Sequence, residues 1–413
     1  MRLRRILVTA SVTTALVALT LGAVFVRGAA AAPATSASSS HGRYSFVHAC
    51  AAPSNGFAAC NAILRVDNVT PHASSPGGYN PPDLQSAYNL PSSTAGSGQT
   101  VAIVDAYDDP NAESDLGVYR SQFGLPACTT ANGCFKKVNQ SGGTKYPRSN
   151  GGWAQEISLD LDMVSAACPN CHIILVEASS ASYTNLGTAV NEAAKLGANA
   201  ISNSYGGSES SGETSYDAYY NHPGIAVTVS SGDGGYGVEY PASSPYVTAV
   251  GGTSLKRDST TTRGWTETVW STSSTEGAGS GCSAYEAQPS WQSSVSNITA
   301  APASCGKRAV ADVSAVADPY TGVSVYDSYS YQGQSGWLVF GGTSVASPLI
   351  ASVYALAGNA STVTAGSYSY SHTSSLNDVT SGQTASCGSD LCAAATGWDG
   401  PTGNGTPNGT GGF

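Results

Sequence analysis

The chain has 413 residues, of which only 11% are charged, and its formal net charge at pH 7 is −10. This length suits one large domain or two ordinary ones, with a substantial core. An acidic chain without clustered lysines or arginines is a poor ligand for nucleic-acid phosphates, so we exclude that class of partner.

The N-terminus has the pattern of an export signal. Three arginines lie within residues 1–5, an apolar run extends from Ile6 to Val26, and small residues occupy 28–32. We predict a signal peptide over 1–32 and a secreted, extracellular mature protein. No later apolar run is long enough to cross a bilayer, so we expect no membrane segment after cleavage. Residues 33–80, rich in Ala, Ser, Pro and Gly, are interpreted as a short pro-segment or lead-in.

The ten cysteines fit an oxidising destination. They fall in couples that are close in sequence, which predicts five local disulfides, although spacing alone does not prove connectivity. One couple has the Cys-x-x-Cys spacing of redox and metal sites, but no second such pair accompanies it, so we favour a structural bridge. The couples are Cys50 with Cys60, Cys128 with Cys134, Cys168 with Cys171, Cys282 with Cys305, and Cys387 with Cys392.

From residue 81 onward, apolar strands alternate with helices. We predict strands at 101–104, 173–176, 198–204, 225–230 and 247–250, and helices at 113–123, 153–167, 184–196 and 349–357. Strands that are apolar on both faces indicate an α/β fold in which helices cover a parallel sheet. Functional sites collect where such strands end, and three of these strands end at Asp105, at Ser204–Gly206 and at Ser231–Asp233.

A turn of small residues precedes the last predicted helix and contains Ser344. Glycines permit a tight turn, and a helix N-terminus offers free N–H groups to a developing negative charge. Pro348 is expected in the first turn of that helix. Because a structural Gly/Ser turn would look the same, the partners of the serine have to decide its role.

None of the six histidines lies in a context that would aim an imidazole at a serine. Glu156 and Asp160 are better candidates, because their spacing places both acids on one face of a helix. Like charges at this spacing repel, but in a desolvated cleft they would share a proton. A solvated acidic face is the alternative. Asp233, in a glycine-rich turn, is either a plain turn residue or, when protonated, a donor to an oxyanion.

With these residues identified, the chain resembles the sedolisin family of serine-carboxyl peptidases, which have a subtilisin-like fold and work in acid. The resemblance spans about Asp83 to the C-terminus and implies a peptidase domain at 81–413, a three-layer α/β fold with a mostly parallel sheet. It also implies that Ser344 is the nucleophile, Glu156 its general base and Asp160 the residue that orients Glu156. Asp233 would stabilise the oxyanion beside the Ser344 N–H. The matching blocks are Glu156–Asp160, Ser231–Asp233, 240–253, Gly342–Pro348 and Gly397–Asp399.

The same resemblance implies one Ca²⁺ ion near the C-terminus. Carboxylates of Asp378 and Asp399 and backbone carbonyls of Val379, Ala395 and Gly397 would form an all-oxygen shell. An unliganded glycine-rich turn is the alternative. The chain departs from the family pattern at Ala395, commonly glycine, at Gly341, often serine, and in its short lead-in, which replaces a large folded prodomain.

We therefore expect a secreted, monomeric endopeptidase that hydrolyses proteins or peptides in acid. A tripeptidyl exopeptidase and a non-catalytic binding module on the same fold are the alternatives. The strand at 201–206 should line the substrate cleft by pairing with peptide backbone. Asp105 is expected to support the site or a turn.

Overall fold

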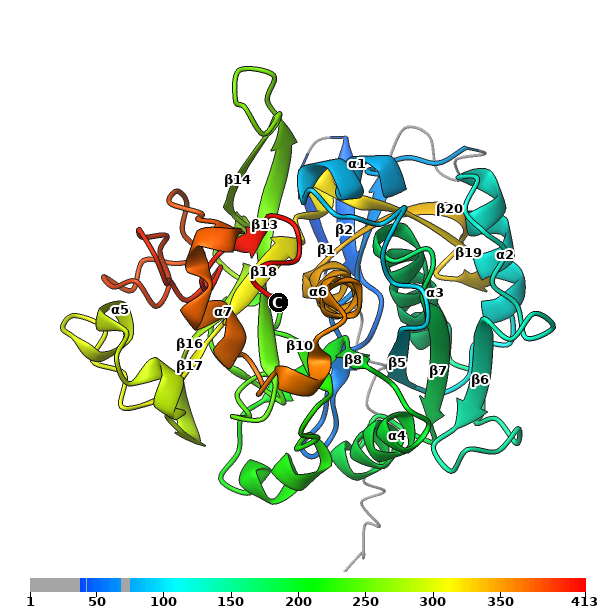
Figure 1. Cartoon of the computed structure of the whole chain (residues 1–413), viewed down its shortest axis with the longest axis horizontal. Helices are drawn as coiled ribbons and strands as arrows, with labels where there is room; N and C mark the ends of the chain where they lie inside the picture. Colours follow the sequence, from blue (N-terminus) through cyan, green and yellow to red (C-terminus); the bar gives the residue numbers. More distant parts are fainter. Residues whose placement is uncertain (1–37, 42, 68–74) are drawn as a thin grey trace, which may run out of the picture. The chain divides into compact units, whose positions relative to one another are not determined.

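The computed structural model describes residues 38–41, 43–67 and 75–413, so the predicted signal peptide lies outside the described residues. Its central element is an eight-stranded sheet of order β14-β13-β10-β8-β5-β7-β6, with β18 paired to β13 (Figure 1). All neighbours are parallel except β13 and β14. The strands are β5 (Thr100–Ala106), β6 (Phe135–Asn139), β7 (His172–Ala178), β8 (Ala200–Asn203), β10 (Ala226–Ser230), β13 (Thr248–Arg257), β14 (Trp265–Val269) and β18 (Val313–Val316).

Helices cover this sheet, as the apolar strands predicted. α3 (Gly151–Ala167) and α6 (Thr343–Ala357) pack against each other and against the strands in the middle of the sheet, and α2 (Ala112–Gln122) packs on α3 (Figure 1). α4 (Tyr183–Lys195) covers β5 and β7. Residues 101–104 of β5 are wholly buried, which explains why both faces of the strand are apolar. The predicted three-layer α/β fold is confirmed.

The N-terminal residues join a second, antiparallel sheet. Its order is β1 (Ser38–His41), β2 (Tyr44–His48), β4 (Ile63–Asp67), β20 (Gln334–Gly341) and β19 (Val323–Tyr331). Between β2 and β4, the short β3 (Ala59–Cys60) pairs with β9 (Tyr205–Ser208), which also pairs with β12 (Glu239–Tyr240). Described residues of the predicted lead-in therefore pair directly with strands of the predicted peptidase domain.

The remaining α-helices and strands lie outside these two sheets. They are α1 (Pro81–Ala87), β11 (Gly234–Tyr236), β15 (Ser271–Ser273), β16 (Glu276–Ala287), α5 (Ser296–Thr299), β17 (Lys307–Val310), α7 (Ser367–Ser371), β21 (Leu376–Asn377) and β22 (Thr406–Pro407). All five predicted disulfides are present. Among the described residues, no helix has the length and apolar character needed to cross a membrane.

The predicted helices and strands are confirmed with shifts of a few residues at their ends, apart from two boundaries. The strand predicted at 247–250 continues as β13 to Arg257. The last long helix, α6, begins at Thr343 and not at 349, so Ser344 lies inside it. The expectation that Pro348 sits in the first turn is therefore wrong, because it is the sixth residue of the helix. A proline there cannot donate to the carbonyl four residues back, which leaves the Ser344 carbonyl without its helical partner.

Candidate active site

Ser344 is held at the start of α6 by a tight turn. Gly342 caps the helix with a positive φ of 92°, a conformation that favours glycine, and its N–H donates to the Ala317 carbonyl at 2.6 Å. A Cβ atom on Gly342 would lie 1.9 Å from the carbonyl oxygen of Asn61. This packing fixes the backbone beside Ser344, whose side chain is fully buried.

The hydroxyl of Ser344 points at the carboxyl group of Glu156. Its Oγ donates to Glu156 Oε2 at 2.9 Å and lies 3.3 Å from the Ser204 carbonyl oxygen. Glu156 lies in α3, which Asn150 caps by accepting a hydrogen bond from the Trp153 N–H at 3.2 Å. The two helices that carry serine and acid pack side by side, so the pair is positioned by rigid elements.

Asp160 lies one turn further along the same helix. Its Oδ1 accepts a hydrogen bond from Ser204 Oγ at 2.8 Å. Burial raises the pKa of both Glu156 and Asp160 well above the ordinary range, and the neighbouring Asp160 raises that of Glu156 further. Asp105, at the end of β5, is also buried, and its burial and the nearby Asp160 raise its pKa. Three carboxyl groups thus share one dry site, and they cannot all be charged.

Asp233 follows β10 and approaches the residue before the serine. Its Oδ1 accepts hydrogen bonds from the N–H and Oγ1 of Thr343, each at 2.8 Å. Among the described residues, its Oδ2 has no hydrogen-bond partner. Burial raises the pKa of Asp233 well above the ordinary range, which favours the protonated form. A protonated Oδ2 could donate to an oxygen held next to the Ser344 N–H.

The structure thus brings together Ser344, Glu156, Asp160 and Asp233, the residues that the sequence suggested. Within the described part of the chain, the hydrogen bonds of the Ser344 side chain involve no histidine. The sequence placed Ser204 at the end of a strand but did not predict its role in the site. Its carbonyl contacts Ser344 Oγ, and its hydroxyl donates to Asp160. The hint was its position after an apolar strand, where side chains of neighbouring parallel strands converge.

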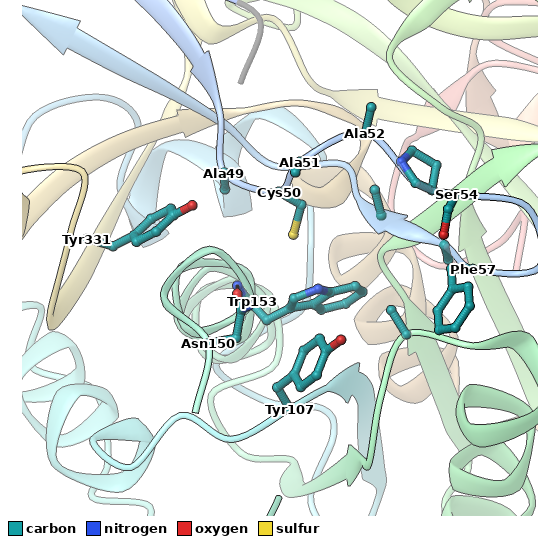
Figure 2. Close-up of a pocket in the computed structure, with 14 residues that line it drawn as sticks. Ala49, Cys50, Ala51, Ala52, Ser54, Phe57, Tyr107, Asn150, Trp153 and Tyr331 are labelled. Atoms are coloured by element: carbon teal, nitrogen blue, oxygen red, sulfur yellow. Dashed lines mark hydrogen bonds between the residues drawn. The ribbon is translucent and has the colours of Figure 1, made fainter. Parts of the chain in front are cut away.

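A pocket of about 240 Å³ lies at the start of α3, where Asn150 and Trp153 are among the residues that line it. Figure 2 shows Trp153 of α3 lying between the Cys50 loop and Tyr107. The pocket is lined by residues 49–54 and 57–59 on one side and by the central domain, including Ala181, on the other. The N-terminal segment therefore covers the start of the helix that carries Glu156.

The residues of the predicted Ca²⁺ site also converge. The Gly397 N–H donates to Asp378 Oδ2 at 3.0 Å, and the Ala395 N–H donates to Asp399 Oδ2 at 3.2 Å. Burial, and to a smaller extent the charge of Asp378, raises the pKa of Asp399 to about 8. The described residues contain no cluster of three or more acidic, His or Cys side chains that could hold a metal. An ion here would need backbone carbonyls such as that of Val379 as well, and this oxygen-only donor set fits Ca²⁺.

Known proteins share this fold and much of this sequence. The model of the Subtilase family matches residues 137–375. Kumamolisin from Bacillus sp. (strain MN-32) is 32% identical over 309 residues, which are 68% of this chain and 52% of that protein. Sedolisin from Pseudomonas sp. (strain 101) is 30% identical over 373 residues, which are 80% of this chain and 60% of that protein. The chain thus spans between half and two thirds of the length of these relatives.

Two solved structures resemble this fold. Pseudomonas sedolisin, a serine-carboxyl proteinase complexed with two molecules of pseudo-iodotyrostatin, matches with a TM-score of 0.66 and 28% identity over 81% of this chain and 96% of that one. The S41 psychrophilic protease, at 18% identity and a TM-score of 0.51, covers 81% of this chain and 99% of its own and supports the fold alone. The chain belongs to the subtilase family of serine peptidases, and its similarity to kumamolisin and sedolisin supports the sedolisin family.

Proposed function

We propose that this protein is a secreted serine-carboxyl endopeptidase that cleaves proteins or peptides at acidic pH. The observation that carries the proposal is the 2.9 Å hydrogen bond from Ser344 Oγ to Glu156 Oε2. A serine becomes a nucleophile when a base within hydrogen-bond distance removes its proton, and here a carboxylate occupies the place of that base.

In the proposed reaction, Glu156 accepts the Ser344 proton as Oγ attacks the peptide carbonyl carbon. The resulting oxyanion is stabilised by the Ser344 N–H and by protonated Asp233. Glu156 then returns the proton to the leaving amine, and a water molecule, deprotonated by the same carboxylate, hydrolyses the acyl-enzyme. Asp160 shares one proton with Glu156, so Asp160 helps to set the pKa at which Glu156 accepts the second proton, the one that comes from Ser344.

These protonation states set the two limits of the working pH range. Catalysis needs one negative charge on the Glu156–Asp160 pair and a proton on Asp233. In water, carboxyl groups titrate near pH 4, and burial raises the pKa of all three groups here. Activity should therefore rise as the pair loses its first proton and fall as Asp233 loses its own.

Other features support an exported endopeptidase. Five disulfides suit an oxidising compartment, and we propose residues 1–32 as the signal peptide that directs export. The paired segment from β3 to β4 passes the serine and continues on both sides, which favours an open cleft over the closed one of a tripeptidyl exopeptidase.

All proposed catalytic residues come from one chain, in keeping with a monomer. Asp378 and Asp399 would hold Ca²⁺, which when bound would neutralise their charge.

The test is hydrolysis of a denatured protein by the purified full chain between pH 2 and pH 8. We expect activity on the acid side only, and none from Ser344→Ala. Glu156→Gln should lose about 10²- to 10⁴-fold in kcat, the range typical of a general base. Glu113→Gln, which changes an acid on the surface helix α2, is the control and should keep full activity. Equal activity in the wild type, Ser344→Ala and Glu156→Gln would refute the mechanism.

A further inference from the structure

The outer strand of the five-stranded sheet is held by acidic side chains from two helices. This strand, β19, pairs with β20 on one side. Two of its backbone N–H groups donate to carboxyl groups and not to another strand. The Tyr326 N–H donates to Asp162 Oδ2 at 2.9 Å, and the Ser328 N–H donates to Asp115 Oδ2 at 2.7 Å. Asp162 lies in α3 and Asp115 in α2, so one strand is hydrogen-bonded to both helices (Figure 1).

These hydrogen bonds connect the two segments that carry the candidate catalytic pair. Glu156 lies in α3, six residues before Asp162. The hairpin of β19 and β20 ends at Gly341, which leads through a single glycine into α6 and Ser344. The position of the hairpin on α3 therefore contributes to the position of the serine relative to its base. A displacement of about 1 Å in such a pair is enough to cost about 10²-fold in rate.

Between the two hydrogen-bonded residues of β19 lies Asp327, whose side chain is enclosed. The residue is 0% exposed, and its Oδ1 accepts a hydrogen bond from the Tyr329 N–H at 2.7 Å. Its Oδ2 is buried and has no hydrogen-bond partner among the described residues. Burial, and then repulsion from Asp109 and Asp115, raises the pKa of Asp327 to about 8. Asp327 therefore keeps its proton at acidic pH while β19 is in place.

The positive charges nearby are engaged by other groups. Arg120 donates to Ser165 Oγ and to two backbone carbonyls, and Lys137 forms ion pairs with Asp108 and Glu177. β20 carries no titratable side chain. A charge on Asp327 would therefore be added to a buried and predominantly acidic region. The titratable groups on the surrounding segments are Asp108, Asp109, Asp115, Tyr119, Arg120, Lys137, Asp162 and Glu177.

We propose that this contact is a latch: while Asp327 is protonated, Asp115 and Asp162 hold β19 on α2 and α3 and keep Ser344 opposite Glu156, and deprotonation of Asp327 releases the hairpin of β19 and β20. The effect on activity rests on the peptidase function above, whereas the movement itself does not. The only bond that breaks covalently is the O–H bond of Asp327, whose proton passes to water. Asp115 and Asp162 are positioning residues in this scheme.

The pH dependence of the release follows from proton linkage. A released Asp327 has the ordinary pKa of 3.8, and a docked one has a pKa of about 8, so opening releases one proton between these pH values. The docked state is favoured below this range, and the equilibrium constant for opening should rise about tenfold per pH unit within it. From pH 5 to pH 7 the hairpin should therefore open about 100-fold more often.

The test is hydrogen–deuterium exchange of the full chain between pH 5 and pH 7.5, read by mass spectrometry and corrected for the intrinsic exchange rate at each pH. Ser344→Ala is the background, so that the protein cannot digest itself. Protection of peptides from 323–341 should fall about 100-fold from pH 5 to pH 7, while peptides from β5 keep theirs. Asp327→Asn should keep the hairpin protected over this range. Glu113→Gln is the control on α2, because Glu113 contacts Thr130 and not β19.

Substitutions of Asp162 test the positioning role. Asp162→Leu removes the acceptor for the Tyr326 N–H, so the hairpin should lose protection already at pH 5. With Ser344 present, the same variant should lose about 10²-fold in kcat on a peptide at pH 4. Asp162→Asn keeps an oxygen at this place and should retain both protection and kcat. Equal behaviour of the Leu and Asn variants would overturn the inference.

The remaining outcomes separate the latch from the proposed function. A hairpin that stays protected up to pH 7.5, or that loses protection in Asp327→Asn as in the parent protein, would overturn the inference. Simultaneous loss of protection in the hairpin and in β5 would also overturn it, since that result shows unfolding of the whole domain. If the hairpin alone is released but the wild type digests no protein at any pH, the movement is supported and the proposed peptidase function fails.

Discussion

Asp233 provides the sharpest test of the chemistry, because its proposed role depends on a proton. Its Oδ1 accepts two hydrogen bonds from Thr343, and its Oδ2 is free to donate only when protonated. In Asp233→Asn, the amide oxygen can keep both bonds to Thr343, while the NH₂ group donates at every pH. Asp233→Ala removes the donor. The oxyanion would then keep one of its two donors, the Ser344 N–H, and the loss of one such donor costs about 10²- to 10³-fold in kcat.

The two variants should differ in their pH profiles as well as in rate. In the wild type, kcat should fall as pH rises through the elevated pKa of Asp233 and the donor is lost. In Asp233→Asn this alkaline fall should shift upward, and kcat should lie well above that of Asp233→Ala at each pH. The measurement is kcat against pH for the three proteins on one peptide, with thermal unfolding to confirm that they fold. The reasoning would be refuted if the Asn and Ala variants were equally impaired with the same pH profile.

Three other predictions address stability. Burial raises the pKa of Asp327 from an ordinary 3.8 to about 8 in the folded state, so unfolding between these pH values releases a proton and stability should fall as pH rises through this range. Asp327→Asn should flatten this fall and raise the Tm at pH 7 but not at pH 3. An unchanged dependence of the Tm on pH in this variant would contradict the prediction. A Ca²⁺ chelator should lower the Tm, since Ca²⁺ at 100 times its Kd contributes about 2.7 kcal/mol to the stability of the folded state. Asp378→Asn should unfold at the same temperature as the wild type in chelator and should not respond to the chelator. A chelator effect as large in this variant as in the wild type would exclude this site. Gly342→Ala should strongly destabilise the fold, because its Cβ would collide with the Asn61 carbonyl, whereas Gly117→Ala in α2, where a Cβ meets open space, should stabilise by about 0.5–1 kcal/mol by chemical denaturation.

The sequence was sufficient for the features that depend on local pattern. The helical period of its apolar residues placed α3, and the four-residue spacing of Glu156 and Asp160 put both carboxyl groups on one face of it. Apolar runs identified the strands of the central sheet, and short separations identified the disulfides. The turn before α6 was also recognisable, because few residue types can occupy the conformation of Gly342.

What the sequence did not indicate were contacts between distant segments. Asn61 and Ser344 are far apart in the chain, and their proximity depends on the pairing of β3 with β9 and of β4 with β20. A two-residue strand such as β3 carries almost no periodic signal. The start of α6 was placed too late because Pro348 was taken as a first-turn residue. The carbonyl of Ser344, which this proline leaves without its helical partner, lies 3.5 Å from Ser204 Oγ.

The burial that protects the nucleophile also links activity to stability through pH. Glu156, Asp160 and Asp233 are ionisable groups that are buried from solvent, and burial favours their neutral forms. The same cause acts on Asp327, away from the serine, where burial again raises the pKa. As pH rises through the elevated pKa of Asp233, the proposed donor would lose its proton, while deprotonation of Asp327 would create a charge that the folded state solvates poorly. In the proposed mechanism, buried carboxyl groups set the working pH range, and a histidine base, which is charged in acid, could not replace Glu156 at low pH.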